Sequence, residues 1–140
     1  MTEMLSNSEQ LARRAVACAT WRWMPGMLCL TDEDGYAARV LHVGLNASTS
    51  ETADAYSGGG IITRGCLKDD SLPDLEDPAT LGCLLVLVRE AWGDPCICTA
   101  VDNTSAGWWV DGWTAACSQV PSDLHPTEAA ALVAALEAAP

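Results

Sequence analysis

The clearest pattern along the chain is a nearly continuous apolar segment, at residues 77–92, that lies between strong helix-boundary signals. Asp77 is a favourable N-cap, and Pro78 occupies the first helical position, where its missing N–H costs no hydrogen bond. Gly93 and Pro95 end the segment. The large side chains at helical spacing are Leu81, Leu84, Leu85, Val88 and Trp92, and most of the remaining circumference is apolar too. The pattern predicts a central helix that is nearly surrounded by other elements.

Two further helices are predicted near the ends of the chain. Residues 6–9 read Ser-Asn-Ser-Glu and match a capping box, with Ser6 as the N-cap of a helix that runs to about residue 19. Near the other end, Pro126 opens a helix whose apolar face comprises Ala129, Leu132, Val133 and Leu136. Each helix therefore has one apolar face with which it can pack onto a sheet.

Strands are predicted as hairpins between these helices. The first hairpin joins residues 21–30 to 36–43 through an acidic turn that ends in Asp-Gly. The second begins at 96–101 and returns over 108–120, as one strand or a strand pair. Short connections imply antiparallel pairing. The sequence thus predicts an α+β domain in which an antiparallel sheet of about four to five strands packs against about three helices in two layers.

The range 44–76 has the composition of a loop. It contains Gly58-Gly59-Gly60, many serines and threonines, and several acidic residues. We predict a long acidic loop here, with a short strand at 61–66 as its one regular part, inside a single domain that spans 1–140. Loops of this length in a compact domain are usually functional.

The charge of the chain limits its partners. Among 140 residues, 19 are acidic and 7 are basic, which gives a formal net charge of −12. Such a chain is repelled by nucleic acids and by anionic membranes, so we expect it to bind neither directly. The longest apolar run, at 81–88, is too short to span a bilayer, and the N-terminus lacks a secretory pattern. We expect a cytoplasmic protein.

The sequence offers little for metal or covalent chemistry. The seven cysteines are odd in number and lie mostly in apolar segments, which is typical of reduced, buried thiols. Cys96 and Cys98 are separated by one residue, and His42 and His125 are isolated, so no zinc-ligand spacing is present. Neither a complete P-loop nor a Gly-x-Ser-x-Gly motif occurs. We therefore predict a non-enzymatic protein without metal or cofactor.

Tryptophan dominates the aromatic residues, with six Trp, two Tyr and no Phe. Neighbouring residues of a strand point to opposite faces, so one of Trp108 and Trp109 should face away from the core. Tryptophan is enriched at interface hot spots. We predict a partner-binding surface that combines this pair with acidic residues of the loop; its members are Trp108, Trp109, Asp69, Asp70, Asp74 and Glu76.

A second candidate site lies in the first hairpin. Trp21 and Trp23 share a face of the predicted strand, with Arg22 between them, and Arg22 and Arg39 could lie opposite each other. Convergence of these arginines with Arg64 would create an anion pocket beside a tryptophan platform. Ion pairing of the arginines with nearby carboxylates is the competing interpretation.

Three stretches carry a family resemblance. Residues 18–27 read CATWRWMPGM, residues 72–93 read LPDLEDPATLGCLLVLVREAWG, and the third stretch is 126–139. They resemble a family of short proteins from tailed phages and prophages that has no assigned activity. The resemblance implies a phage origin, and it assigns no role to any residue.

Phage accessory proteins of this size are often inhibitors of host defence, and acidic ones often imitate DNA. The resemblance therefore implies an anti-defence protein, for instance an anti-CRISPR protein, that acts in the host cytoplasm. Its partner would be a host protein such as a nucleic-acid-binding defence effector. Two alternatives remain open: a small-ligand binder such as a sponge for a cyclic-nucleotide immune signal, and a minor structural phage component. The sequence also leaves homo-oligomerisation open.

Overall fold

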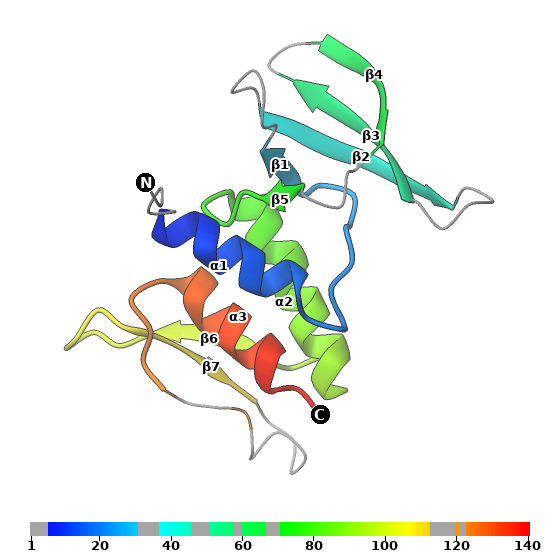
Figure 1. Cartoon of the computed structure of the whole chain (residues 1–140). Helices are drawn as coiled ribbons and strands as arrows, with labels where there is room; N and C mark the ends of the chain where they lie inside the picture. The colour runs from blue at the N-terminus through cyan, green and yellow to red at the C-terminus, as the bar shows by residue number, and fades with distance from the viewer. Residues whose placement is uncertain are drawn as a thin grey trace, which may run out of the picture.

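The computed structural model describes residues 6–30, 37–45, 51–57, 60–66, 71–112, 120 and 123–140 (Figure 1). The elements follow the order α1 (Asn7–Val16), β1 (Leu28–Leu30), β2 (Ala37–Leu45), β3 (Glu51–Ser57), β4 (Gly60–Cys66), β5 (Leu72–Pro73), α2 (Pro78–Trp92), β6 (Cys98–Val101), β7 (Trp108–Asp111) and α3 (Glu128–Ala138). The predicted α+β class, with helices and antiparallel strands, is confirmed.

The described strands form two sheets instead of the single sheet that the sequence predicts. One has the order β4-β3-β2-β1-β5, and the other is the β6–β7 hairpin. All pairs are antiparallel. In Figure 1 the helices lie between the two sheets, and β2, β3 and β4 extend beyond them. The helices therefore separate the sheets, and the arrangement is not a simple two-layer packing.

Strand β4 confirms the short strand that the sequence predicts at 61–66, whereas β3 occupies residues of the range 44–76 that were predicted as loop. They pair with Ser57 opposite Gly60, and β3 also pairs with β2 along its length. Small and acidic residues are depleted in strands, so composition alone favoured a loop. The Gly58-Gly59 dipeptide is a hairpin signal that points the other way.

The first predicted strand is much shorter than expected. Residues 21–27 are irregular, and only Leu28–Leu30 form β1. Pro25 lacks a backbone donor, and Gly26 takes a positive φ of 98° that side-chain-bearing residues rarely adopt. A turn therefore replaces the first part of the strand. The backbone of Gly26 and Met27 bonds to Val40 of β2, and regular pairing with β2 follows at Leu28–Leu30.

Helix α2 has the predicted boundaries. The carboxylate of its N-cap, Asp77, accepts from the N–H of Thr80 at 2.9 Å, and Gly93 ends the helix in the left-handed conformation with φ 65°. These two residues satisfy orphan groups at both ends of the helix. The prediction of a helix over 77–92 is confirmed.

The buried face of α2 is rotated relative to the predicted stripe. Its buried residues are Thr80, Leu84, Leu87, Val88 and Trp92, whereas Leu81 and Leu85 are half-buried. Thr80 belongs to the buried face because its Oγ1 accepts from the backbone N–H of Leu28 in β1 at 2.8 Å. Gly82 and Glu90 are exposed, so α2 is open on one side and not nearly surrounded.

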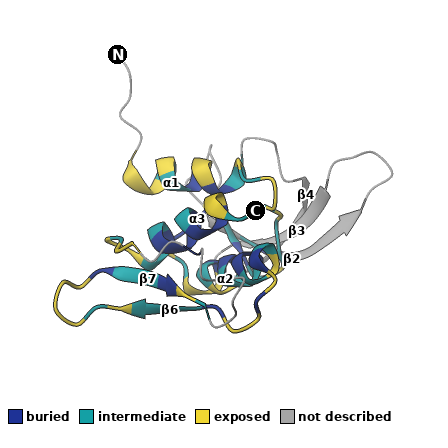
Figure 2. Cartoon of the chain, turned by 90° about the horizontal axis from the view of Figure 1, so that it is seen from below, coloured by how far each residue is buried: buried dark blue, intermediate teal, exposed yellow. Residues whose placement is uncertain are grey.

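The core forms where α2 packs against α3. Leu84 and Val88 of α2 and Leu132 of α3 have no exposed surface. The indole N–H of Trp92 donates to the carbonyl of Ala135 at 2.8 Å, which satisfies a polar group inside the apolar interface. Figure 2 shows α3 between α1 and the β6–β7 hairpin, so this helix links the terminal helix to the second sheet.

We expect Leu84→Ala to reduce the free energy of unfolding by about 2–5 kcal/mol, because the side chain is fully buried and its loss leaves a cavity. The matched control is Leu85→Ala in the next position of the same helix. Leu85 is half-buried, so we expect a loss of about 1–2 kcal/mol. Urea unfolding measures both values, and equal losses would contradict the observed orientation of α2.

Candidate functional site

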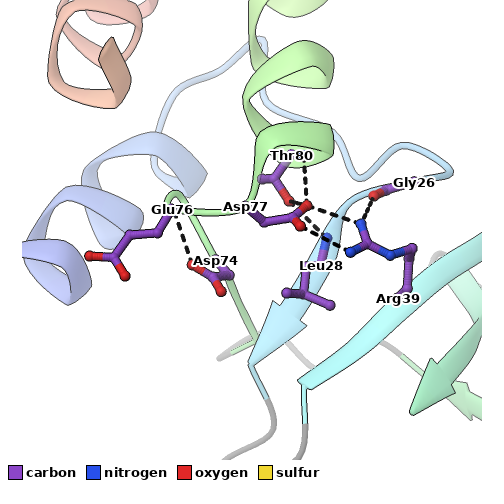
Figure 3. A network of polar contacts seen from close by, with 7 residues as sticks. All are labelled: Gly26, Leu28, Arg39, Asp74, Glu76, Asp77 and Thr80. Carbon is purple, nitrogen blue, oxygen red and sulfur yellow. Dashed lines mark hydrogen bonds and ion pairs between the residues drawn. The ribbon is translucent and has the colours of Figure 1, made fainter. Parts of the chain in front are cut away.

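A polar network joins β2 to the N-terminus of α2 (Figure 3). Nη2 of Arg39 lies 2.9 Å from Oδ1 of Asp77, and Nη1 lies 3.0 Å from Oδ2. Nη1 also donates to the carbonyl of Gly26 at 2.7 Å. Oδ2 of Asp77 accepts two further hydrogen bonds, from the N–H and the hydroxyl of Thr80, each at 2.9 Å. Arg39 therefore binds a helix cap and a turn at once.

The electrostatics of this network favour its charged form. The hydrogen bonds from Arg39 lower the pKa of Asp77 to about 2, with a smaller contribution from Thr80, although partial burial acts in the opposite direction. The same carboxylate raises the pKa of Arg39. Each group therefore stabilises the charged form of the other. The guanidinium of Arg39 already donates to the Asp77 carboxylate and to the Gly26 carbonyl.

The acidic turn before α2 lies beside this network. Oδ1 of Asp74 accepts from the backbone N–H of Glu76 at 2.9 Å, and the hydroxyl of Ser8 donates to Glu76 at 3.4 Å. Figure 3 shows the side chain of Glu76 pointing away from the Arg39–Asp77 pair. Asp69 and Asp70, the other predicted acidic members of the surface, lie outside the described residues.

The two halves of the predicted partner-binding surface are not adjacent. Asp74 and Glu76 precede the N-terminus of α2, whereas Trp108 and Trp109 lie in the hairpin that follows its C-terminus. Figure 1 shows the helices between these regions. The acidic range has the composition of a long loop, and such a loop could reach further than the short β5–α2 turn does, which is why the sequence predicted one combined surface.

The tryptophan pair itself has the expected strand geometry. Trp108 packs against the core on the same face as Val110, which is only 2% exposed. Trp109 lies between them in the strand and so points to the opposite face, away from α3. It is half-buried and pairs across the hairpin with Ala100. Of the two tryptophans, Trp109 is the one directed away from the core.

We call the side of the β6–β7 hairpin that faces away from α3 the outer hairpin face. Its strand residues are Cys98, Ala100, Trp109 and Asp111, which share a side by register and alternation. Leu124 adds to this face from the segment before α3. In Figure 2, among the described elements, α3 covers one side of the hairpin and no helix or strand covers the other.

The position of Leu124 was not predicted from the sequence. His125 and Trp108 exchange two backbone hydrogen bonds of 2.7 and 2.8 Å, which extends the hairpin by one bridge and directs Leu124 to the outer side. A Cβ on Gly107 would come within 3.1 Å of the Cβ of Leu124, so the leucine lies directly over this glycine. Leu124 is nevertheless 50% exposed. The contact is long-range, and no local pattern signals it.

The structure does not bring the alternative ligand-binding arginines together. The guanidinium of Arg22 lies 2.9 Å from Oε1 of Glu90, and this pairing lowers the pKa of Glu90. Glu90 and Asp77 lie at opposite ends of α2, about 20 Å apart along the helix axis. Arg22 and Arg39 are thus ion-paired at separate places, as the competing interpretation holds. The side chain of Arg64 lies outside what the structure describes.

The tryptophans of that alternative set pack against each other. The rings of Trp21 and Trp23 have centroids 5.6 Å apart and an interplanar angle of 81°, an edge-to-face contact. Both are half-buried and pack against the hydrophobic core. In this arrangement the edge of one ring covers the face of the other, so the pair does not form a flat double platform.

The described cysteines and acidic residues give no metal centre. Within the described ranges, no group of three or more His, Cys, Asp or Glu side chains could hold an ion. Cys18, Cys83, Cys96 and Cys98 are thiols, and burial raises the pKa of the first two. None of the described helices has the length and apolar character needed to cross a membrane.

No family model, curated protein or solved structure matches the chain.

Replacement of Asp77 by Asn tests the polar network. The pKa of Asp77 is about 2 in the folded protein, below the unfolded value of about 3.9. Its ion pair therefore stabilises the fold fully above about pH 4, and this stabilisation is lost as the pH falls toward 2. We expect Asp77→Asn to cost about 1–3 kcal/mol near pH 7. The difference from the original protein should shrink near pH 3.

Urea unfolding at the two pH values measures this effect. The matched control is Asp74→Asn, which removes a nearby carboxylate that lies outside the ion pair. A difference between Asp77→Asn and the original protein that grows on acidification would contradict the assignment.

Proposed function

We propose that this chain is a non-enzymatic phage accessory protein that binds and inhibits a host defence factor, and that it does so by occupying a basic, nucleic-acid-binding surface. The net charge of −12 and the resemblance to phage proteins motivate the proposal. The main supporting observation concerns the partners of the arginine side chains. Every arginine whose side chain is described has an acceptor within the protein.

Four of these arginines form ion pairs, and the fifth donates to a backbone carbonyl. The contacts are Arg13–Glu9, Arg14–Glu137, Arg22–Glu90, Arg39–Asp77 and Arg89 to the carbonyl of Ile97. In contrast, Glu76, Asp111 and Asp123 are exposed, and none of them belongs to an ion pair among the described residues. These three carboxylates are therefore presented to solvent without an ion-pair partner in the described part of the chain.

An exposed excess of carboxylates has a defined physical effect on binding. It attracts basic surfaces over a distance of about one Debye length and raises the association rate with proteins that carry them. A basic groove that evolved for phosphates offers lysines and arginines at high density, and carboxylates can pair with the same groups. Occupation of that groove by an acidic protein would exclude nucleic acid.

The same contacts weigh against the small-ligand alternative. A binder of a cyclic nucleotide needs cations that can reach a phosphate, whereas Arg22 and Arg39 are each paired with a carboxylate. An acidic exterior also repels a charged nucleotide. The geometry therefore supports an inhibitor of a basic protein better than a nucleotide sponge.

Capture from a lysate of a bacterium with an active CRISPR system tests the proposal. The tagged protein should retain a basic nucleic-acid-binding protein at about 50 mM salt and lose it at about 500 mM, since screening weakens the contact. Added duplex DNA should displace the captured protein. Recovery of no such protein, or retention that neither salt nor DNA affects, would contradict the proposal.

The inhibitory half of the proposal has its own measurement. Expression of the protein in cells that restrict a phage should restore plaque formation by at least about tenfold. The variant Glu76→Gln/Asp111→Asn/Asp123→Asn removes three exposed carboxylates that the internal ion pairs do not use, so it should fold and restore fewer plaques. Equal plaque counts with the original protein and this variant would be evidence against charge-based inhibition.

A further inference from the structure

We propose that the outer hairpin face is a docking surface for an arginine-bearing apolar segment of a partner protein. This inference names the surface and the partner chemistry of the proposed function, and it rests on that function for its biological role. The face combines three features: partly exposed apolar side chains, exposed carboxylates that belong to no ion pair among the described residues, and a fixed backbone. Each feature is independent of the acidic turn at Asp74 and Glu76.

The apolar part of the surface is formed by Trp109, Ala100 and Leu124. Trp109 and Ala100 are opposite each other in the two strands, and Leu124 covers Gly107 two positions before Trp109. Leu124 is one of two exposed large hydrophobic residues in the described part of the chain. A leucine held half-exposed next to a tryptophan is typical of a contact surface, because tryptophan supplies much binding energy when a partner removes it from water.

The charged part of the surface selects a cation. Asp111 lies two residues after Trp109 on the same face, roughly 7 Å along the strand. Asp123 precedes Leu124 in the chain and so adjoins the margin of this face, and the carboxylates of Asp111 and Asp123 are both exposed. An arginine of the partner could stack on the indole ring while its guanidinium pairs with Asp111. A lysine lacks the planar group that makes both contacts at once.

The backbone beneath this surface is fixed from the other side. Val110 is buried under α3, and the hydroxyl of Thr99 donates to Glu128 in the first turn of that helix at 2.7 Å. At the end of the hairpin, Asp102 accepts from the hydroxyls of Thr104 and Ser105, which lowers its pKa. A surface held in this way loses little conformational freedom when a partner binds.

Titration of the ¹⁵N-labelled full chain with a defined peptide tests the inference. The probe is an acetylated and amidated peptide of three Arg-Leu repeats, and the matched control replaces each arginine with glutamate. We expect the arginine peptide to shift the indole N–H resonance of Trp109 and the amides of 98–102 and 107–111. Trp109→Phe assigns the indole signal. Equal responses to both peptides, or shifts confined to other elements, would overturn the inference.

Two double variants distinguish the effect of local charge on peptide binding from the effect of the overall charge. Asp111→Asn/Asp123→Asn should weaken binding of the arginine peptide about threefold to tenfold. Asp74→Asn/Glu76→Gln removes the same amount of charge at the other end of α2 and should weaken it less than about twofold. Equal weakening by both would overturn the inference, since overall charge would then account for binding.

The outcomes also distinguish this inference from the proposed function. Peptide binding at the hairpin without capture of a basic host protein would support the docking surface and contradict the inhibitor role. Capture of a host protein that is unaffected by Asp111→Asn/Asp123→Asn would support the inhibitor role and contradict the docking surface.

Discussion

The fold depends on the bond between Arg39 and Asp77, because it is where the larger sheet meets the central helix. The carboxylate serves as the N-cap of α2 and as the counterion of a β2 side chain at once. The hydroxyl of Thr80 then connects the same turn of helix to the backbone of β1. The first turn of α2 is thereby bonded to both β1 and β2 at the point where the helix begins.

The sequence predicted features that depend on local chemistry. The ends of α2 followed from Asp77, Pro78 and Gly93, because capping needs only near neighbours. The opposite directions of Trp108 and Trp109 followed from strand alternation. These predictions required no knowledge of what each element packs against.

The features that the sequence did not predict depend on distant partners. The buried stripe of α2 includes Thr80 because a β1 backbone group, 52 residues away in sequence, donates to its hydroxyl. Strand β3 consists largely of small and polar residues, and pairing with β2 on one side and β4 on the other overrides that weak propensity. Leu124 is placed by a bridge between His125 and Trp108. In each case a residue's surroundings, and not its neighbours in the chain, decide its position.

The placement of the helices between the two sheets has a consequence for variation among related chains. An insertion in the β3–β4 hairpin leaves the backbone pairing of β6 and β7 unchanged, because no described strand of the larger sheet pairs with either of them. The hairpin is anchored separately, through Val110 and Thr99 to α3. Related chains can therefore diverge at one sheet while the opposite end keeps its shape, so that a single small scaffold is able to present two independently adjustable ends.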